Sequence, residues 1–388
     1  MKITSELTSS GTLKFSQLAI EKNKKGERII SLGLGEPSFS TPELIIDETI
    51  KAMKSGFTKY SHSMGLISLR ELIKEKLLKE NNIQTDVKNI AITAGAKQAI
   101  FFALMATLEP FDEVINITPS YVSYIPQIKL AEPTAIIHNI DLIKKDFSVN
   151  IQAIKSLFQK RNIKVIILNF PHNPTGKMLN SDEFLELINI LKESNCYIIS
   201  DEIYERLNFS GEKQLSFGAF DEIANRVITI NGFSKTFSMT GWRIGYVHAP
   251  SQISDIIFKI SQHINTNVTT FIQKGACAAF NLENIYLQKF NSELEEKSKI
   301  LINIINSNDK LFINRPLGGF FGFLNIAKLK LDSDSFAHLL LNKKNVATTP
   351  GVSFGENWND HIRISLVANK DEFQEGIEKI VELVNEEF

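Results

Sequence analysis

Short apolar runs alternate with helical patterns between about residues 66 and 310. Leucine and isoleucine residues from Leu66 to Leu77 recur on one face of a predicted helix. Further helices are expected from about Ala96 to Leu108 and from Ser181 to about Ser194. Between the helices lie apolar runs without strict alternation, which are typical of strands covered on both faces. These runs span residues 90–93, 113–117, 165–169, 196–200 and 226–230. The pattern predicts an α/β architecture with a large, mostly parallel mixed sheet flanked by helices.

The two ends of the chain show a different pattern from this central region. Amphipathic helices are predicted near residues 293–305 and 371–384, with short strands at 320–323 and 361–364. We therefore expect a large α/β domain over residues 46–284. A smaller α+β domain is expected from residues 1–45 together with 285–388.

Composition and charge narrow the possible partners of the chain. Its 388 residues carry 43 Lys and Arg against 44 Asp and Glu, so no basic excess favours nucleic acid as a partner. Cys196 and Cys277 have no short spacing, which predicts neither a disulfide framework nor a metal centre and fits a reducing compartment. The polar N-terminus lacks a secretory apolar core, and no stretch approaches ~18 apolar residues. We expect a cytoplasmic protein that does not bind membranes.

Polar residues follow three of the predicted strands where each strand ends. Asn173 comes after the run at 165–169, and Asp201 and Tyr204 come after the next run. Lys235 and Arg243 follow the third run, in the segment Asn-Gly-Phe-Ser-Lys-Thr-Phe-Ser-Met-Thr-Gly-Trp-Arg. Because open α/β sheets bind ligands beyond the carboxyl ends of their strands, these side chains are expected to meet in one cleft.

Two nucleotide-binding motifs are excluded by their missing glycines. A phosphate-binding P-loop needs glycine just before its lysine, where Ser234 stands before Lys235. The Gly33-Leu-Gly35 segment lacks the third glycine of a dinucleotide fingerprint, since Ser38 occupies that position.

The motifs together resemble a known enzyme family. Gly232 to Lys235, Ser238 to Arg243 and Gly245 resemble the lysine signature of class I/II aminotransferases of fold type I. These are pyridoxal-phosphate enzymes related to aspartate aminotransferase. Further motifs are similar and occur in the family's order: Leu34 to Pro37, Asn173 to Gly176, Asp201 to Tyr204, and Ile362 to Ser365. The resemblance runs from about Ser31 to Ser365 and is closest to bacterial aspartate aminotransferases.

The resemblance implies pyridoxal 5'-phosphate as cofactor and assigns catalytic roles. Lys235 would form the Schiff base with the cofactor and then move the α-proton of the substrate. Asp201 would hold the proton on the pyridine nitrogen, and Asn173 and Tyr204 would bind the phenolic oxygen. We predict Lys235, Asp201 and Tyr204 as the catalytic residues.

The resemblance also implies how the rest of the cofactor is bound. Residues at the start of a helix and in the lysine signature would surround the phosphate and the ring, with Tyr121 stacked on the ring. Beyond the catalytic residues and Asn173, the predicted cofactor-binding residues are Gly95, Ala96, Lys97, Tyr121, Ser234 and Arg243. Tyr60 would reach the phosphate of the neighbouring subunit, so the resemblance implies a homodimer with shared active sites.

Substrate recognition is expected to centre on Arg363, whose guanidinium would pair with the α-carboxylate through two parallel bonds. Gly35, Tyr121 and Asn173 complete the predicted substrate-binding set. Lys97 either contacts a distal carboxylate or is a solvated lysine in the first turn of a helix. The position where prephenate-using relatives carry a further basic residue is about Thr8, so the resemblance does not extend to prephenate.

The implied activity is transfer of an amino group between an L-amino acid and a 2-oxo acid such as 2-oxoglutarate. Aspartate is the leading donor, and aromatic amino acids come next. The alternative is a lyase or synthase on the same scaffold, of the carbon–sulfur lyase or aminocyclopropane-carboxylate synthase type. A non-catalytic regulator fused to a DNA-binding module ranks last, since only about 30 residues precede Ser31.

Overall fold

The structure is a computed structural model that describes residues 11–282 and 284–388. Its largest sheet has seven strands in the order β2-β8-β7-β6-β5-β3-β4. β8 runs antiparallel to both of its neighbours, and the other pairs are parallel. The strands are β2 (Ile90–Thr93), β3 (Glu113–Thr118), β4 (Ile136–Asp141), β5 (Ile163–Asn169), β6 (Tyr197–Asp201), β7 (Val227–Gly232) and β8 (Gly245–His248). The predicted α/β architecture with a mostly parallel mixed sheet is confirmed.

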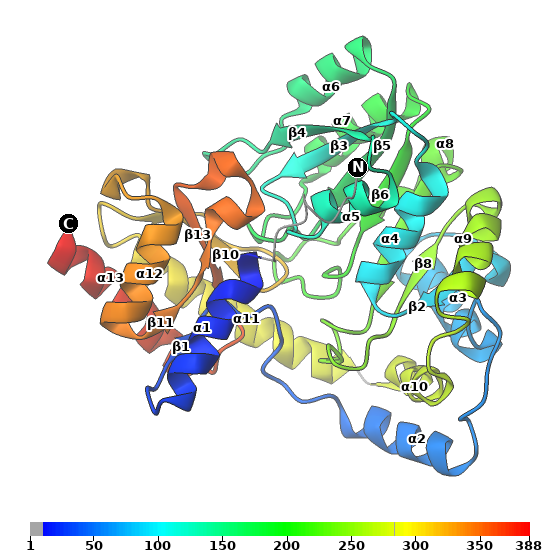
Figure 1. Ribbon diagram of the computed structural model, residues 1–388, viewed down its shortest axis with the longest axis horizontal. Helices are drawn as coiled ribbons and strands as arrows, with labels where there is room; N and C mark the ends of the chain where they lie inside the picture. The colour runs from blue at the N-terminus through cyan, green and yellow to red at the C-terminus, as the bar shows by residue number, and fades with distance from the viewer. Residues whose placement is uncertain (1–10, 283) are drawn as a thin grey trace.

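Helices cover both faces of this sheet (Figure 1). Val165 and Ile167 of β5 belong to the buried cluster with α4, whereas Ile166 and Leu168 belong to the cluster with α7. Burial on both faces explains why residues 165–168 of this strand form an uninterrupted apolar run. The helices of this part are α2 (Glu43–Lys54), α3 (Ile67–Asn81), α4 (Ala96–Thr107), α5 (Tyr124–Ala131), α6 (Ile151–Lys160), α7 (Ser181–Lys192), α8 (Asp221–Ala224), α9 (Ser251–Ile264) and α10 (Thr270–Ala276).

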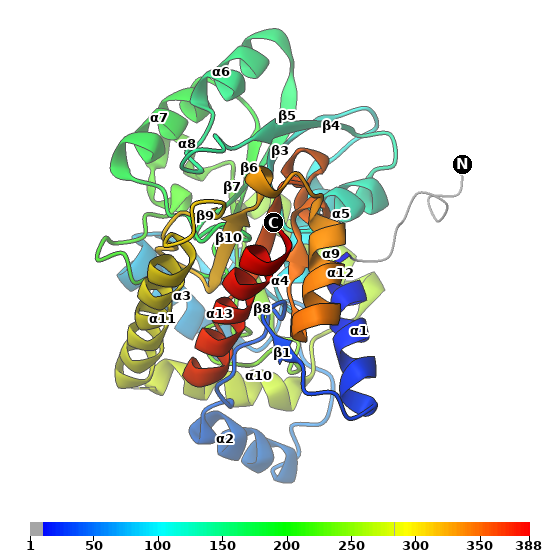
Figure 2. The ribbon, with the colours of Figure 1, turned by 90° about the vertical axis from the view of Figure 1, so that its left-hand side faces the viewer.

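A second group of strands joins the two ends of the chain. β1 (Ile30–Ser31) pairs in parallel with β11 (Val346–Ala347). Next to them stands a four-stranded antiparallel sheet in the order β12-β13-β10-β9. Its strands are β9 (Phe312–Ile313), β10 (Phe321–Asn325), β12 (Thr349–Pro350) and β13 (His361–Ser365). The helices here are α1 (Gly11–Lys24), α11 (Asn284–Ile305), α12 (Ser333–Lys344) and α13 (Lys370–Glu387), and α13 packs against α11 and α12 (Figure 2).

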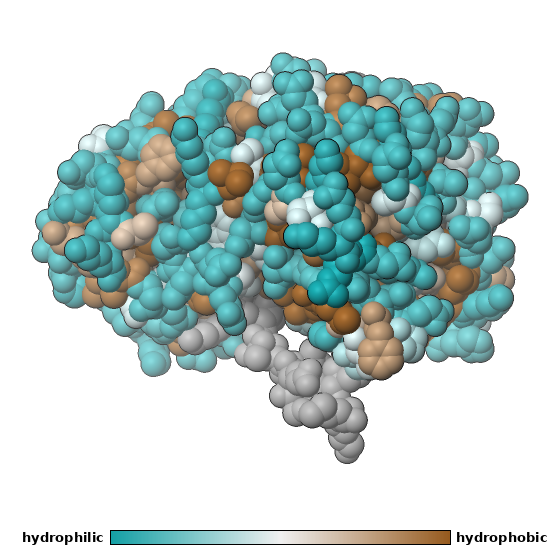
Figure 3. Space-filling model, turned by 90° about the horizontal axis from the view of Figure 1, so that it is seen from above, coloured by the Kyte–Doolittle hydropathy of each residue, from teal (hydrophilic) through white to brown (hydrophobic). Residues whose placement is uncertain are grey.

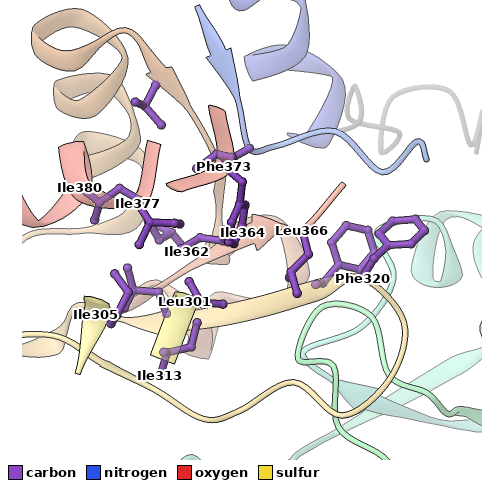
Figure 4. Close-up of a cluster of buried hydrophobic side chains, with 14 of the residues drawn as sticks. Leu301, Ile305, Ile313, Phe320, Ile362, Ile364, Leu366, Phe373, Ile377 and Ile380 are labelled. Atoms are coloured by element: carbon purple, nitrogen blue, oxygen red, sulfur yellow. The ribbon is translucent and has the colours of Figure 1, made fainter. Parts of the chain in front are cut away.

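An aliphatic and aromatic core holds these elements together (Figure 4). Leu301 and Ile305 of α11 meet Ile362 and Ile364 of β13, and Phe373 of α13 closes the cluster. Each of these side chains is at most 1% exposed, so the cluster removes them from water almost completely. β13 is therefore fixed firmly, which matters because it carries Arg363.

One predicted helix start is confirmed and another needs correction. The helix predicted from Ser181 begins at that residue and is capped by Asn180, which forms a capping box with Glu183. The helix predicted from Glu293 begins at Asn284, because Phe290 is buried in the same core as Leu294 and extends the packed face. The predicted domain boundaries fall in the first turn of α2 and at the start of α11.

The surface seen from above is mainly hydrophilic, with apolar residues in small groups (Figure 3). Within residues 11–282 and 284–388, no helix is both long and apolar enough to span a membrane. The polar segment 1–10, on which the prediction of no secretory signal rests, lies outside the described residues, as does Thr8.

Candidate active site

A cavity of about 510 Å³ lies beyond the carboxyl ends of β5, β6 and β7. Because these strands are parallel neighbours, the segments that follow them emerge at the same edge of the sheet. Most of the predicted site residues line this one cavity. They are Gly35, Ala96, Lys97, Tyr121, Asn173, Asp201, Tyr204, Ser234, Lys235, Arg243 and Arg363.

Lys235 is half-buried in this cavity, in the loop that follows β7. Its Nζ donates a hydrogen bond of 2.6 Å to the carbonyl oxygen of Gly35. Burial and the positive charge of Arg363 lower the pKa of Lys235 to about 8, while Glu36 opposes this shift. An appreciable fraction of the amine is therefore neutral near pH 7, as a nucleophilic lysine requires.

Asp201 is the last residue of β6, and its side chain is buried. Its Oδ2 accepts a 2.7 Å hydrogen bond from the Tyr124 hydroxyl, and its Oδ1 accepts one of 3.2 Å from the Ile203 amide. Burial raises the pKa of Asp201 to about 6, and the hydrogen bond from Tyr124 is the largest opposing effect. The carboxyl group is therefore mostly ionised at neutral pH.

Asn169 fixes the backbone of two neighbouring strand ends. Its Nδ2 donates to the carbonyl oxygen of Asp201 at 2.9 Å, and its Oδ1 accepts from the Asn173 amide at 3.1 Å. The side chains of Asp201 and Asn173 therefore project from a backbone held by one shared amide.

Arg363 enters the cavity from β13 and is 4% exposed. Its Nη1 donates to Oδ1 of Asn173 at 3.1 Å, and its Nη2 donates to the carbonyl oxygen of Gly33 at 2.8 Å. The guanidinium carbon lies 4.0 Å from the ring centroid of Phe321. Burial lowers the pKa of Arg363 to about 10, so the guanidinium remains charged at neutral pH.

Gly95 lies behind the cavity wall and allows Arg243 to approach the start of α4. Arg243 donates from Nη2 to the carbonyl oxygen of Ala94 at 3.2 Å and from Nη1 to that of Thr240 at 2.9 Å. A Cβ at position 95 would lie 2.6 Å from Nη2 of Arg243, and φ of Gly95 is +80°. Glycine is therefore the residue that this close approach requires.

Two predicted residues stand apart from the buried part of the site. Tyr60 is 87% exposed and does not line the cavity of its own chain. Its predicted role in a neighbouring subunit stays a prediction. Lys97 is exposed at the cavity wall, with Nζ 5.7 Å from the ring centroid of Tyr121.

Some residues of the site are absent from the sequence-based prediction. Tyr124 and Asn169 contact Asp201 directly, and Phe321 stacks on Arg363. Asn169 closes the apolar run that precedes the Asn173 motif, so its place at the strand end could have identified it. Tyr124 comes three residues after Tyr121, at the first position of α5, but that spacing does not say which way its ring points.

The chain matches the family model described as aminotransferase class I and II over residues 27–380. This chain belongs to that family. A probable aspartate/prephenate aminotransferase of Aquifex aeolicus is 35% identical over 98% of each chain. The aspartate aminotransferase of Bacillus subtilis is 34% identical over 99% of this chain and 98% of its own. An aromatic aminotransferase structure from Pyrococcus horikoshii superposes with a TM-score of 0.89 at 34% identity, covering 95% of this chain and 99% of the other.

These similarities confirm the predicted family, the fold of type I and the aminotransferase function. Members of this family depend on pyridoxal phosphate and act on amino acids and oxo acids. The lyase or synthase alternative is less supported, because the relatives named above are aminotransferases.

Proposed function

We propose that this aminotransferase binds pyridoxal phosphate in the cavity between the carboxyl ends of β5, β6 and β7. The observation that carries the proposal is the meeting of the Lys235 amine, the Asp201 carboxylate and the Arg363 guanidinium in one cavity. Amino transfer needs three groups: an amine, a carboxylate that faces the ring nitrogen of the cofactor, and a cation that binds the carboxylate of the substrate.

The donor set fits each part of the cofactor. The phosphate would be held by Arg243, the Ser234 hydroxyl and the first amides of α4, which have no acceptor within the helix. Gly95 supports this, because a side chain there would collide with Arg243. Asn173 and Tyr204 would bind the phenolic oxygen, and the half-buried ring of Tyr121 would stack on the cofactor.

Bound pyridoxal phosphate supplies an electron sink that allows the bonds at the substrate's α-carbon to be broken and remade. Lys235 would take the proton from that carbon and return it, a role suited to a pKa of about 8. Asp201 would hold a proton on the pyridine nitrogen, since a buried carboxylate strongly favours a cationic partner. Arg363 and Gly35 would orient the substrate through its α-carboxylate.

We propose aspartate as the first amino donor, aromatic amino acids as the next, and 2-oxoglutarate as acceptor. Support for this order comes from the names of the relatives. Lys97 supports a dicarboxylic substrate, because it is an exposed cation on the same cavity. It would contact the distal carboxylate of aspartate, although a solvated Lys97 is the other possibility.

We also propose a homodimer, with Tyr60 completing the phosphate site of the neighbouring subunit. The high exposure of this tyrosine leaves it accessible to a partner. The domains are proposed at residues 46–284 and at 1–45 with 285–388, the smaller one closing over the substrate and excluding water. Contacts of Gly33 and Gly35 with Arg363 and Lys235 support closure at this edge. A cytoplasmic location completes the proposal.

Cofactor capture and product analysis together test the proposal. After incubation with pyridoxal phosphate and reduction with borohydride, mass spectrometry should find the cofactor on the Lys235 peptide and not in a Lys235→Ala variant. In a separate, unreduced sample loaded with pyridoxal phosphate, aspartate with 2-oxoglutarate should yield oxaloacetate and glutamate. A colourless protein without a trapped adduct would refute the cofactor assignment. Release of homocysteine, pyruvate and ammonia from cystathionine, with no transfer of the amino group to 2-oxoglutarate, would identify the lyase instead.

A further inference from the structure

The carboxylate of Asp201 has few hydrogen-bond donors for a buried charged group. Tyr124 donates to Oδ2 at 2.7 Å and the Ile203 amide donates to Oδ1 at 3.2 Å. Among residues 11–282 and 284–388, no other side chain donates to this carboxylate in the structure. A buried ionised carboxylate is costly unless hydrogen bonds compensate for lost water, so the Tyr124 hydroxyl carries unusual weight.

Tyr124 reaches Asp201 from outside the cavity. It is the first residue of α5 and 2% exposed, and its ring packs edge to face against Tyr121 at 5.5 Å between centroids. Tyr121 lines the cavity, whereas Tyr124 does not. The two tyrosines, three residues apart, therefore differ in position: Tyr121 lies in the cavity, and Tyr124 lies behind the Asp201 carboxylate. Tyr124 can therefore affect the cavity through its hydrogen bond to Asp201 or through its ring packing on Tyr121.

We propose that Tyr124 is a positioning residue, which orients the Asp201 carboxylate and keeps it ionised by donating its phenolic hydrogen to Oδ2. The inference rests on the proposed function, in which Asp201 faces the pyridine nitrogen. Tyr124 remains a donor throughout, because burial and the neighbouring Asp201 raise the pKa of its hydroxyl well above the ordinary value.

The electrostatics of the cluster give the sign of the effect. Burial favours the protonated form of Asp201, while the Tyr124 hydroxyl and the charge of Lys235 favour the ionised form. Tyr121 and Tyr204 help to raise the pKa of Tyr124, and Asp201 helps to raise the pKa of Tyr204. Removing the Tyr124 hydroxyl should therefore raise the pKa of Asp201 from about 6. Since hydrogen bonds to charged groups are the stronger class, the rise should be about one to two pH units.

Tyr124→Phe is the decisive variant, because it keeps the ring and its packing against Tyr121 and removes a single oxygen. Tyr246→Phe provides a matched control. Tyr246 is also buried, at 4% exposed, and its ring packs against Phe233, but it lies on β8 and does not line the cavity. Both variants remove one buried hydroxyl, and only the first removes it from Asp201.

The first measurement needs no cofactor. The full chain is labelled with ¹³C at aspartate carboxyl carbons, and the Asp201 signal is identified by its loss in Asp201→Asn. Its titration midpoint should be near 6 in the wild type and in Tyr246→Phe. The Tyr124→Phe midpoint should be about one to two units higher. A midpoint unchanged in Tyr124→Phe would overturn the proposal.

The second measurement uses the enzyme loaded with pyridoxal phosphate. In Tyr124→Phe, the acid limb of the profile of kcat against pH should shift to higher pH by the same one to two pH units. Activity should therefore recover at higher pH, and KM for the donor should change little. An equal loss of kcat at every pH would mean a merely structural role and would also overturn the proposal. A chain that captures no cofactor would refute the proposed function, while the carboxyl titration would still decide the role of Tyr124.

Discussion

Arg363→Lys separates recognition of the α-carboxylate from every other function of the site. In the structure the guanidinium donates from Nη1 to Asn173 and from Nη2 to Gly33, and it stacks 4.0 Å from the ring centroid of Phe321. Lysine keeps the positive charge but presents a point charge instead of a planar pair of donors. The substitution therefore removes two-point pairing while the cavity stays cationic.

The size of the effect follows from the lost hydrogen bond. A hydrogen bond to a charged group contributes ~1.5–3 kcal/mol, which corresponds to a fall of about 10- to 150-fold in kcat/KM. Burial strengthens the expectation, because Arg363 is only 4% exposed and water cannot easily replace the missing donor. The loss should depend on the presence of an α-carboxylate in the substrate.

Matched substrates turn this expectation into an assay. Single-turnover rates would be measured for aspartate and for β-alanine, which lacks only the α-carboxylate of aspartate. The preference of the wild type for aspartate should shrink by about 10- to 150-fold in Arg363→Lys. Arg226→Lys is the control, since Arg226 donates to the carbonyl oxygens of Leu191 and Cys196 and does not line the cavity. Equal slowing of both amines would refute carboxylate pairing by Arg363.

Three further predictions concern charge. The neutral amine of Lys235 is the nucleophile, so the rate of cofactor capture should rise with pH until about 8, the pKa of this lysine. Absorbance would follow the capture, and Lys235→Arg should capture no cofactor. Asp201→Asn should lower kcat by roughly 100- to 1000-fold, because an ion pair contributes roughly 4 kcal/mol at ~4 Å, while the Kd for the cofactor changes less than about tenfold. Asp360 accepts hydrogen bonds of 2.7 Å from both Lys144 and His361. Burial alone would raise the pKa of Asp360, but the hydrogen bonds and charges of these two partners hold it at about 2. A lowered carboxyl pKa stabilises the fold above pH ~4, and this stabilisation is lost as the pH falls towards 2. Asp360→Asn should therefore lower the free energy of unfolding, measured with urea, by about 1–2 kcal/mol at pH 7 and by less at pH 3.

The parts of the fold that were predictable are those fixed by local pattern. β5, β6 and β7 are buried on both faces, so each is an apolar run that ends where polar residues begin. α4 was predictable because Gly95 marks the point where β2 has ended and the helix begins. In each case the sequence signal and the packing have the same cause, namely burial of consecutive or periodic side chains.

The parts that were missed depend on contacts between distant segments. β8 has only four residues and directly follows the lysine signature, and its antiparallel pairing with β2 and β7 is set by the return of the chain across the sheet. The first two turns of α11 are stabilised by burial of Phe290 among residues of other elements. Periodicity within a short segment carries no information about such partners.

The same distinction separates the site residues that were predictable from Tyr124. Asn173, Asp201 and Lys235 lie at or just after the ends of adjacent parallel strands, so the topology of the sheet alone brings them to one edge. Tyr124 lies on a helix after β3, and its contact with Asp201 depends on how α5 is rotated against the sheet. That rotation is set by the burial of residues such as Ile128, which shares a core with Tyr124. The groups that hold the reacting atoms can therefore be deduced from strand order, whereas the groups that adjust their charge require the packed structure.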